Sequence, residues 1–209
     1  RGSCPEIFCT EGTEAVSSYA VMNILDFMDA IGEDSLRAVL SEFSCPKNLE
    51  IQEFMQKNAI EFAKKKTSIT YLLIDDEYRI HGIFAVTHKA LQVMSRELSG
   101  TVRKKLQRYA QEDEETGELT LSAFLIGQFG KNYQYDDLPT ITGVQLMDAA
   151  FEVLESVQHQ IGGGVVYLEC EEKPQLLEFY QNEANRFRIF GERYSERDQT
   201  KYIQLLKTF

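Results

Sequence analysis

The spacing of apolar residues divides the chain into helical and extended segments. Apolar side chains recurring every three or four residues predict helices over Met22–Ala30, Leu49–Lys64, Gly143–His159 and Pro174–Asn182. Asn48 is placed to cap the second of these helices. A further segment, Leu36–Phe43, fits either a short helix or a first strand.

Extended segments alternate with these helices. The runs Ile69–Ile74 and Tyr78–Val86, joined by an acidic turn, predict a β-hairpin. The long, nearly uncharged run Leu119–Phe129 is typical of a central strand, and residues 95–117 fit a solvated helix followed by an exposed turn. Later strands are expected at Val165–Cys170, Phe187–Phe190 and Tyr202–Leu206. This order predicts the α/β class, with a mixed, mostly antiparallel sheet and helices on both faces.

Length and composition fit one folded domain. The chain has 209 residues, and we expect residues 22–209 to form a single domain with an N-terminal helical segment. Residues 1–21, which begin Arg1-Gly2-Ser3, are expected to be a vector-derived or disordered tail, or upstream sequence translated before a native start at Met22. No secretory signal or long apolar run is visible, which favours a cytoplasmic protein with no membrane segment. Four scattered cysteines suggest reduced thiols and no metal site.

Charge restricts the classes of partner. The net charge of −11 and the pI of about 4.8 disfavour general nucleic-acid binding, because an acidic surface repels phosphate backbones. A nucleotide cofactor is still compatible, since it needs only a local patch or a helix N-terminus.

Several segments together resemble a known family. The hairpin TSITYLLIDDEYRIHGIFAV, the run Leu125–Gly130, and Leu168-Glu169-Cys170 followed by Phe179-Tyr180 resemble landmarks of the GNAT superfamily of acetyltransferases, in particular its toxin-type branch. The resemblance covers roughly Leu36–Phe209. It implies a sheet whose fourth and fifth strands splay apart, with acetyl-CoA as cosubstrate in the opening between them.

The resemblance also implies the residues that bind acetyl-CoA. Main-chain groups of the fourth strand would pair with the pantetheine amides, and the start of the next helix would bind the pyrophosphate. The corresponding residues are Phe129, Gly130, Lys131, Ile141, Thr142, Gly143 and Val144. The family's Arg/Gln-x-x-Gly-x-Gly/Ala loop is absent, however, and Gly143 alone matches its last glycine. An ordinary helix cap at Thr140 or Thr142 is the alternative interpretation.

Tyr180 is the candidate catalytic residue. The family uses a tyrosine at this helix position to protonate or stabilise the departing thiolate, whereas the alternative role is core packing beside Phe179. Glu169 and His88 are candidate general bases, with structural roles favoured for both. Cys170 lacks a histidine partner at a suitable spacing and is rejected as a nucleophile.

Three functions follow from this interpretation. The first is transfer of acetyl from acetyl-CoA to an amine of a small molecule or protein, with the acceptor unknown and a homodimer left open. The second is an inactive module of the same fold that senses acyl-CoA or binds a protein. The third, acetylation of aminoacyl-tRNA, would need a basic surface, for which only Lys64–Lys66 and Arg103–Arg108 could serve.

Overall fold

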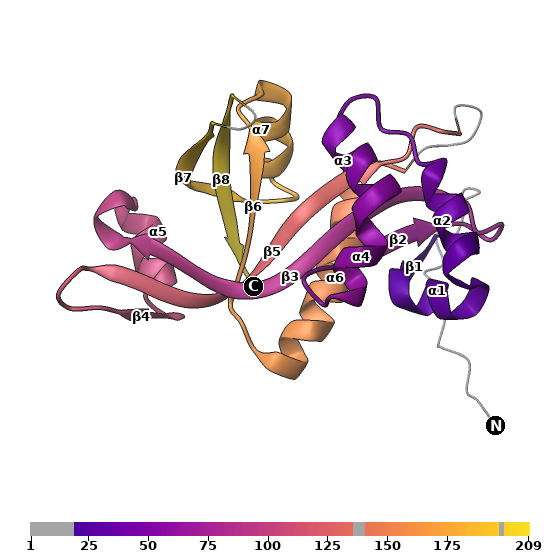
Figure 1. The fold of residues 1–209 in the computed structure, drawn as a ribbon. Helices are drawn as coiled ribbons and strands as arrows, with labels where there is room; N and C mark the ends of the chain where they lie inside the picture. Colours follow the sequence, from indigo (N-terminus) through magenta and orange to yellow (C-terminus); the bar gives the residue numbers. More distant parts are fainter. Residues whose placement is uncertain (1–18, 136–140, 197–198) are drawn as a thin grey trace. The chain divides into compact units, whose positions relative to one another are not determined.

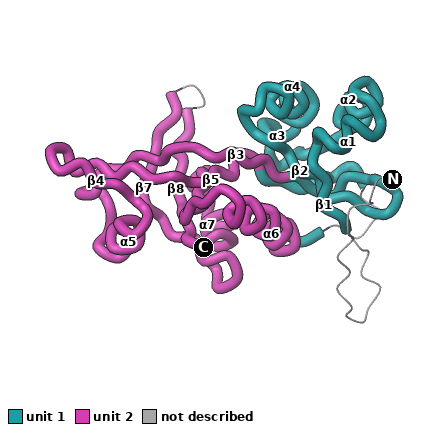
Figure 2. Tube along the Cα trace, turned by 90° about the horizontal axis from the view of Figure 1, so that it is seen from below, with its two compact units in different colours: residues 1–83, 129–142 teal, residues 84–128, 143–209 magenta. Residues whose placement is uncertain are grey.

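The computed structural model describes residues 19–135, 141–196 and 199–209. The chain divides into two compact units, shown in Figure 2. Unit 1 contains the chain up to Ile83 together with Phe129–Thr142. Unit 2 contains Phe84–Gln128 and Gly143–Phe209.

The described strands form one eight-stranded sheet (Figure 1). Its order is β1-β2-β3-β5-β6-β8-β7, with β4 beside β5. Pairing is parallel between β5 and β6 and antiparallel in the pairs β1–β2, β4–β5, β6–β8 and β7–β8. The strands are β1 (Ala20–Asn23), β2 (Ile69–Ile74), β3 (Ile80–Met94), β4 (Ala110–Glu112), β5 (Glu118–Lys131), β6 (Val165–Glu171), β7 (Arg188–Ser195) and β8 (Thr200–Thr208). The predicted mixed, mostly antiparallel sheet is confirmed, and the predicted central strand is β5.

Unit 1 contains short helices, the first two strands, the start of β3 and the end of β5. Its helices are α1 (Ile24–Ile31), α2 (Glu33–Ser41), α3 (Leu49–Glu53) and α4 (Ala59–Lys64), with a π-helical turn at Phe54–Asn58 between α3 and α4. The ambiguous segment Leu36–Phe43 therefore belongs mainly to a helix. Asn48 caps α3 as predicted, since its side-chain oxygen accepts from the backbone N–H of Glu50 and Ile51.

The first helix begins later than the sequence pattern predicts. Ala20–Asn23 form strand β1, which pairs with Tyr71–Ile74 of β2, and α1 begins at Ile24. Asn23 sets this boundary because its side chain accepts a 2.9 Å hydrogen bond from the N–H of Leu25. The sheet thus includes two residues before Met22, where we placed the start of the domain. The rest of the predicted tail, residues 1–18, lies outside the described residues.

Unit 2 has helices on both faces of its strands. On one face, α5 (Gly100–Leu106) packs into a core cluster through Val102 and Leu106, against Leu119, Leu121, Ala123, Val165 and Tyr167 of the sheet. On the other face, Phe124 of β5 contacts Phe209, which contacts Phe151 of α6 (Gly143–Ile161). Alternate residues of β5 thus point to opposite layers, as strand geometry requires.

The described residues contain neither a membrane-spanning helix nor a cluster of metal ligands. None of the described helices combines the length and apolarity needed to cross a bilayer. Within the same ranges, no group of three or more His, Cys, Asp or Glu side chains is placed to hold a metal ion.

Candidate functional site

The parallel pair β5–β6 separates part-way along its length. Pairing runs from Ala123–Val165 to Ile126–Leu168, whereas β5 continues to Lys131 and β6 continues to Glu171 beside β8. Past Ile126 the two strands no longer share a register. This separation corresponds to the splay expected from the resemblance between the fourth and fifth strands, which are β5 and β6 here because the short strand β4 intervenes.

Tyr180 lies in the last turn of α7 (Pro174–Gln181), and its ring contacts Phe187, which in turn contacts Phe151 of α6. Pro174 starts this helix, where a missing N–H costs nothing. The ring of Tyr180 packs edge-on against Phe179 and Phe187, with centroids 5.0 and 5.9 Å away. Its side chain is 7% exposed, so Tyr180 is part of the core. The core-packing role considered for it is thus present.

Burial sets the protonation state of Tyr180. Burial, with a smaller contribution from Cys170 of β6, raises the pKa of Tyr180 well above its usual value. The phenol therefore keeps its proton at neutral and moderately alkaline pH. It can donate a hydrogen bond to a developing anion, although it is a weak acid for complete proton transfer.

The beginning of α6 lies against α7. A Cβ atom added to Gly143 would lie 2.9 Å from the ring of Phe179, so glycine is required here for close packing. This contact supplies a structural reason for Gly143 that does not involve a ligand. Val144 is 37% exposed and Ile141 is buried, while the alternative cap Thr140 lies outside the described residues.

In unit 1, the end of β5 contains the other predicted cofactor-binding residues. Phe129, Gly130 and Lys131 are all half-buried. A Cβ atom on Gly130 would lie 3.0 Å from Ile51 of α3, so the space beside this glycine is filled by a side chain. The ammonium of Lys131 lies 5.8 Å from the ring centroid of Tyr133, in cation–π contact.

The two candidate bases are both engaged in other interactions. Glu169 of β6 accepts hydrogen bonds from Nε of Arg193 at 3.0 Å and from Nε2 of Gln204 at 2.7 Å. Burial raises the pKa of Glu169, but these bonds and the charge of Arg193 outweigh it and hold the pKa below its usual value. His88 is exposed, with Nε2 3.0 Å from the hydroxyl of Ser122. These contacts fit the structural roles that we favoured for both residues.

Cys170 is unsuited to nucleophilic attack. Burial, with a smaller contribution from Glu171, raises the pKa of the Cys170 thiol to about 11. The thiol is therefore protonated at neutral pH, and the reactive thiolate is scarce. This agrees with its rejection on sequence grounds.

A cavity of about 310 Å³ lies in unit 2 beside the point where β5 and β6 separate. Its lining comes from β3, β5, β6 and β7: Lys89, Leu125, Ile126, Gly127, Tyr167, Glu169 and Arg193. Along β6, the side chains of Tyr167 and Glu169 point to one face of the sheet and that of Cys170 points to the other. Cys170 is close enough to Tyr180 to contribute to the raised pKa of its phenol. The cavity and Tyr180 therefore lie on opposite faces of β6.

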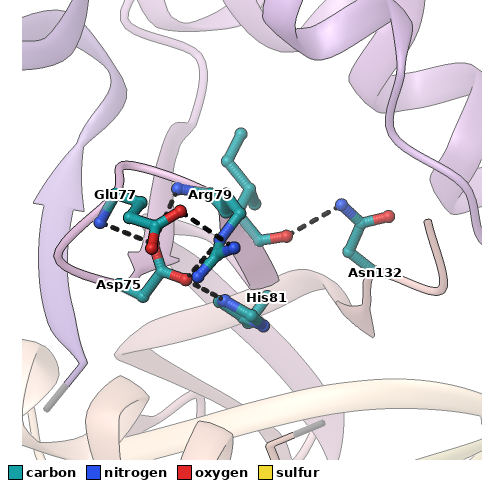
Figure 3. A network of polar contacts seen from close by, with 6 residues as sticks. Asp75, Glu77, Arg79, His81 and Asn132 are labelled. Atoms are coloured by element: carbon teal, nitrogen blue, oxygen red, sulfur yellow. Dashed lines mark hydrogen bonds and ion pairs between the residues drawn. The ribbon is translucent and has the colours of Figure 1, made fainter. Parts of the chain in front are cut away.

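Unit 1 contains a buried polar network that the sequence analysis missed (Figure 3). The Asp75 carboxylate accepts from the N–H groups of Glu77 and Arg79 at 2.9 and 3.0 Å, and from Nε of Arg79 and Nε2 of His81 at 2.8 Å each. Asn132 donates to the carbonyl of Ile80 at 2.8 Å. The acidic turn residue was predicted, but its link to His81, six positions later, was not.

This network holds Asp75 ionised. Burial raises the pKa of Asp75, but hydrogen bonds from His81 and Arg79 outweigh burial and hold it well below its usual range. His81 is only 5% exposed and packs edge-on against Tyr19, 5.1 Å away. The contacts identify a structural centre of the β2–β3 hairpin.

Comparison with known proteins gives matches in structure only. No protein-family model and no curated protein matches the sequence. A structure described as AtaT complexed with acetyl-methionyl-tRNAfMet matches with a TM-score of 0.62 at 14% identity, covering 91% of this chain and 95% of that chain. A mutant of KacT, with tyrosine replaced by phenylalanine, matches with a TM-score of 0.61 at 13% identity, covering 91% and 94%. AtaTR bound with AcCoA matches with a TM-score of 0.56 at 12% identity, covering 92% and 94%.

These matches define the class of fold. The chain has the GNAT fold, which it shares with the AtaT and KacT structures. The resemblance inferred from the sequence is thereby confirmed for the fold, over nearly the whole chain. At 12–14% identity the matches do not carry over activity or binding residues.

Proposed function

We propose that this protein is an acetyl-CoA-dependent N-acetyltransferase that transfers acetyl directly to an amine. The observation that carries the proposal is the separation of β5 from β6 past Ile126, with Tyr180 buried on one side of β6 and a cavity on the other. The AcCoA complex of a protein with the same fold supports acetyl-CoA as the cosubstrate.

The proposed cofactor contacts follow the strand and the helix. Backbone groups of Phe129, Gly130 and Lys131 would pair with the pantetheine amides, as an added strand would. The residues from Ile141 to Val144, at and before the start of α6, would bind the pyrophosphate through backbone N–H groups and the helix dipole. With Gly143 tightly packed on Phe179, main-chain donors rather than a flexible glycine loop would make this contact.

In the proposed reaction, the neutral amine attacks the thioester carbonyl. A C–N bond forms, the C–S bond breaks, and the proton lost by the amine ends on the CoA sulfur. The Tyr180 hydroxyl donates a hydrogen bond to that sulfur as negative charge develops on it. Because the pKa of Tyr180 is raised by burial, stabilisation by hydrogen bonding is favoured over full transfer of the phenolic proton.

Two other functions remain alternatives. The missing glycine-rich loop would suit an inactive module that senses acyl-CoA or binds a protein. AtaT in complex with acetylated tRNA favours a tRNA-directed toxin, but the described cations here are partly neutralised: Lys64 pairs with Glu33 and Arg103 with Glu112. Together with the charge of −11, these pairs favour an acceptor other than tRNA.

Calorimetric titration with acetyl-CoA tests the proposal. We expect micromolar binding to the wild-type chain and to Tyr180→Phe, because the lost hydroxyl acts on the departing sulfur and not on the bound cosubstrate. With an amine that is turned over, Tyr180→Phe should lower kcat about 10- to 100-fold, the value of one hydrogen bond to a charged group.

Tyr194→Phe is the matched control, since Tyr194 is 58% exposed and its hydroxyl contacts Gln199. It should change neither binding nor kcat. Absence of acetyl-CoA binding to the wild-type chain would overturn the proposed function and favour the interaction module. Binding with an unchanged kcat in Tyr180→Phe would remove the role assigned to Tyr180.

We also propose that the protein works in the cytoplasm. Cys45 and Cys170 are both buried free thiols, which suits a reducing compartment. Finding the native protein outside the cytoplasm by cell fractionation would contradict this assignment.

A further inference from the structure

The cavity beside the separating strands has an unusual set of polar groups for so acidic a chain. Two cations, Lys89 and Arg193, and one anion, Glu169, line it. The carboxylate of Glu169 is already bonded to Arg193 and Gln204, so its negative charge is balanced inside the wall. The excess charge facing the cavity is therefore positive, in contrast to the net charge of −11.

Two donors in this wall have no hydrogen-bond partner among the described residues. Lys89 is exposed and forms no hydrogen bond within that part of the chain, although its charge contributes to lowering the pKa of Glu169. Tyr167 is 5% exposed, packs edge-on against Phe190, and its hydroxyl has no hydrogen-bond partner among the described residues. A hydroxyl that lines a cavity and has no protein partner among the described residues is available to donate a hydrogen bond to a ligand.

The guanidinium of Arg193 is fixed in position. It is held by Glu169 through two nitrogens and lies 5.0 Å from the ring centroid of Tyr202, in cation–π contact. Such fixation lowers the entropy lost when a ligand binds. A fixed guanidinium, a lysine and a phenol around one cavity suit a group with several acceptor oxygens.

We propose that this cavity binds the acceptor substrate and that the acceptor is an amine that also carries a carboxylate or phosphate group. The proposal rests on the proposed acetyl transfer, because the cavity lies on the face of β6 opposite Tyr180, where β5 and β6 are no longer paired. An amine whose anionic group is held by Lys89, Tyr167 and Arg193 would reach a thioester through that separation. Local charge thus selects an anionic acceptor, whereas net charge alone would suggest a cationic one.

Matched pairs of amines test this assignment on the full chain. β-Alanine is compared with propylamine for the carboxylate, and O-phosphoethanolamine with ethanolamine for the phosphate, by ligand-observed NMR titration without acetyl-CoA. In at least one pair, the amine with the anionic group should bind about tenfold more tightly than the amine without it, and the pair that responds identifies the group.

Variants then connect binding to the cavity. Lys89→Met should weaken binding of the anionic member about three- to fivefold, as expected for an exposed charge. Tyr167→Phe should weaken it about tenfold, because a hydrogen bond to a charged group is lost. Lys104→Met, an exposed lysine of α5 outside the cavity, is the control and should have no effect. Circular dichroism and thermal unfolding verify that each variant is folded.

Equal binding of the two members of each pair, or binding unchanged in both Lys89→Met and Tyr167→Phe, would overturn the assignment. A parallel acetyl-CoA titration separates this failure from failure of the proposed function. If acetyl-CoA binds and the amines show no discrimination, this inference alone is wrong. If the amines discriminate through Lys89 and Tyr167 but acetyl-CoA does not bind, the cavity is an anion-selective ligand site and the acetyltransferase assignment is wrong.

Discussion

Removing the Asp75 carboxylate should destabilise the protein more than its position in a turn suggests. Asp75→Ala removes the acceptor for four hydrogen bonds from three residues of the hairpin and leaves the His81 ring without that partner. The side chain of Asp75 is 9% exposed, so water can replace little of this bonding. The network is drawn in Figure 3.

The decrease in the free energy of unfolding can be worked out from the hydrogen-bond partners of Asp75. The bond to His81, which is 5% exposed, contributes about 1.5–3 kcal/mol. Arg79 is 32% exposed, so solvent screening reduces its share to about 0.5–1 kcal/mol. Water can reach the N–H of Glu77, which adds little. The sum is about 2–4 kcal/mol, or a drop of about 5–15 °C in Tm for a chain of this size.

The stability difference should also depend on pH. The pKa of Asp75 is lowered on folding, so the unfolded chain takes up the proton first as the pH falls. The stabilisation is therefore complete above the unfolded-state pKa of about 3.9 and is lost progressively below it. Urea unfolding of the wild-type chain and of Asp75→Ala should differ most at pH 7 and converge toward pH 3.

Asp76→Ala, one position along the same turn at an exposed residue, is the control and should cost less than about 0.5 kcal/mol. A difference between wild type and Asp75→Ala that stays constant from pH 7 to pH 3 would refute the electrostatic reasoning. So would equal stabilities of the two alanine variants at pH 7.

Three further predictions concern two packing contacts and one buried hydroxyl, and urea unfolding tests each of them. Gly143→Ala should cost about 1–2 kcal/mol by clashing with Phe179, and Phe179→Leu should relieve part of this cost; purely additive effects would contradict the packing role. Gly130→Ala should also lower the free energy of unfolding, and Ile51→Val should relieve part of this cost by removing a methyl group near the new Cβ atom. Additive effects of these two substitutions would show that the contact is unimportant. Thr70→Val should be neutral or stabilising by up to about 1 kcal/mol, because the buried Thr70 hydroxyl lacks a partner among the described residues; a clear loss would reveal one.

The sequence by itself determined most of the element order. Long periodic segments such as Gly143–His159 and Leu119–Phe129 lie within one or two residues of α6 and β5 at most boundaries. Their apolar spacing is set by which face is buried, and local sequence carries that information. Strand β1 was missed because a four-residue strand exists through its pairing with β2, which no local pattern records.

The candidate site was only partly accessible from the sequence. Order and spacing pointed to Tyr180 and to the splay beside it, because a family resemblance summarises tertiary structure that this chain shares. They could not show that Phe179 accounts for Gly143, or that Glu169 is bonded to Arg193, since these contacts join residues 36 and 24 positions apart.

Tertiary structure alone decided the local electrostatics. A net charge of −11 is a sum over the whole chain, whereas a ligand responds to the few charges within a Debye length of it. Folding places Lys89, Tyr167 and Arg193 around one cavity and balances Glu169 within its wall. The sequence thus determined which elements form, and the packing of those elements decided which charges a ligand meets.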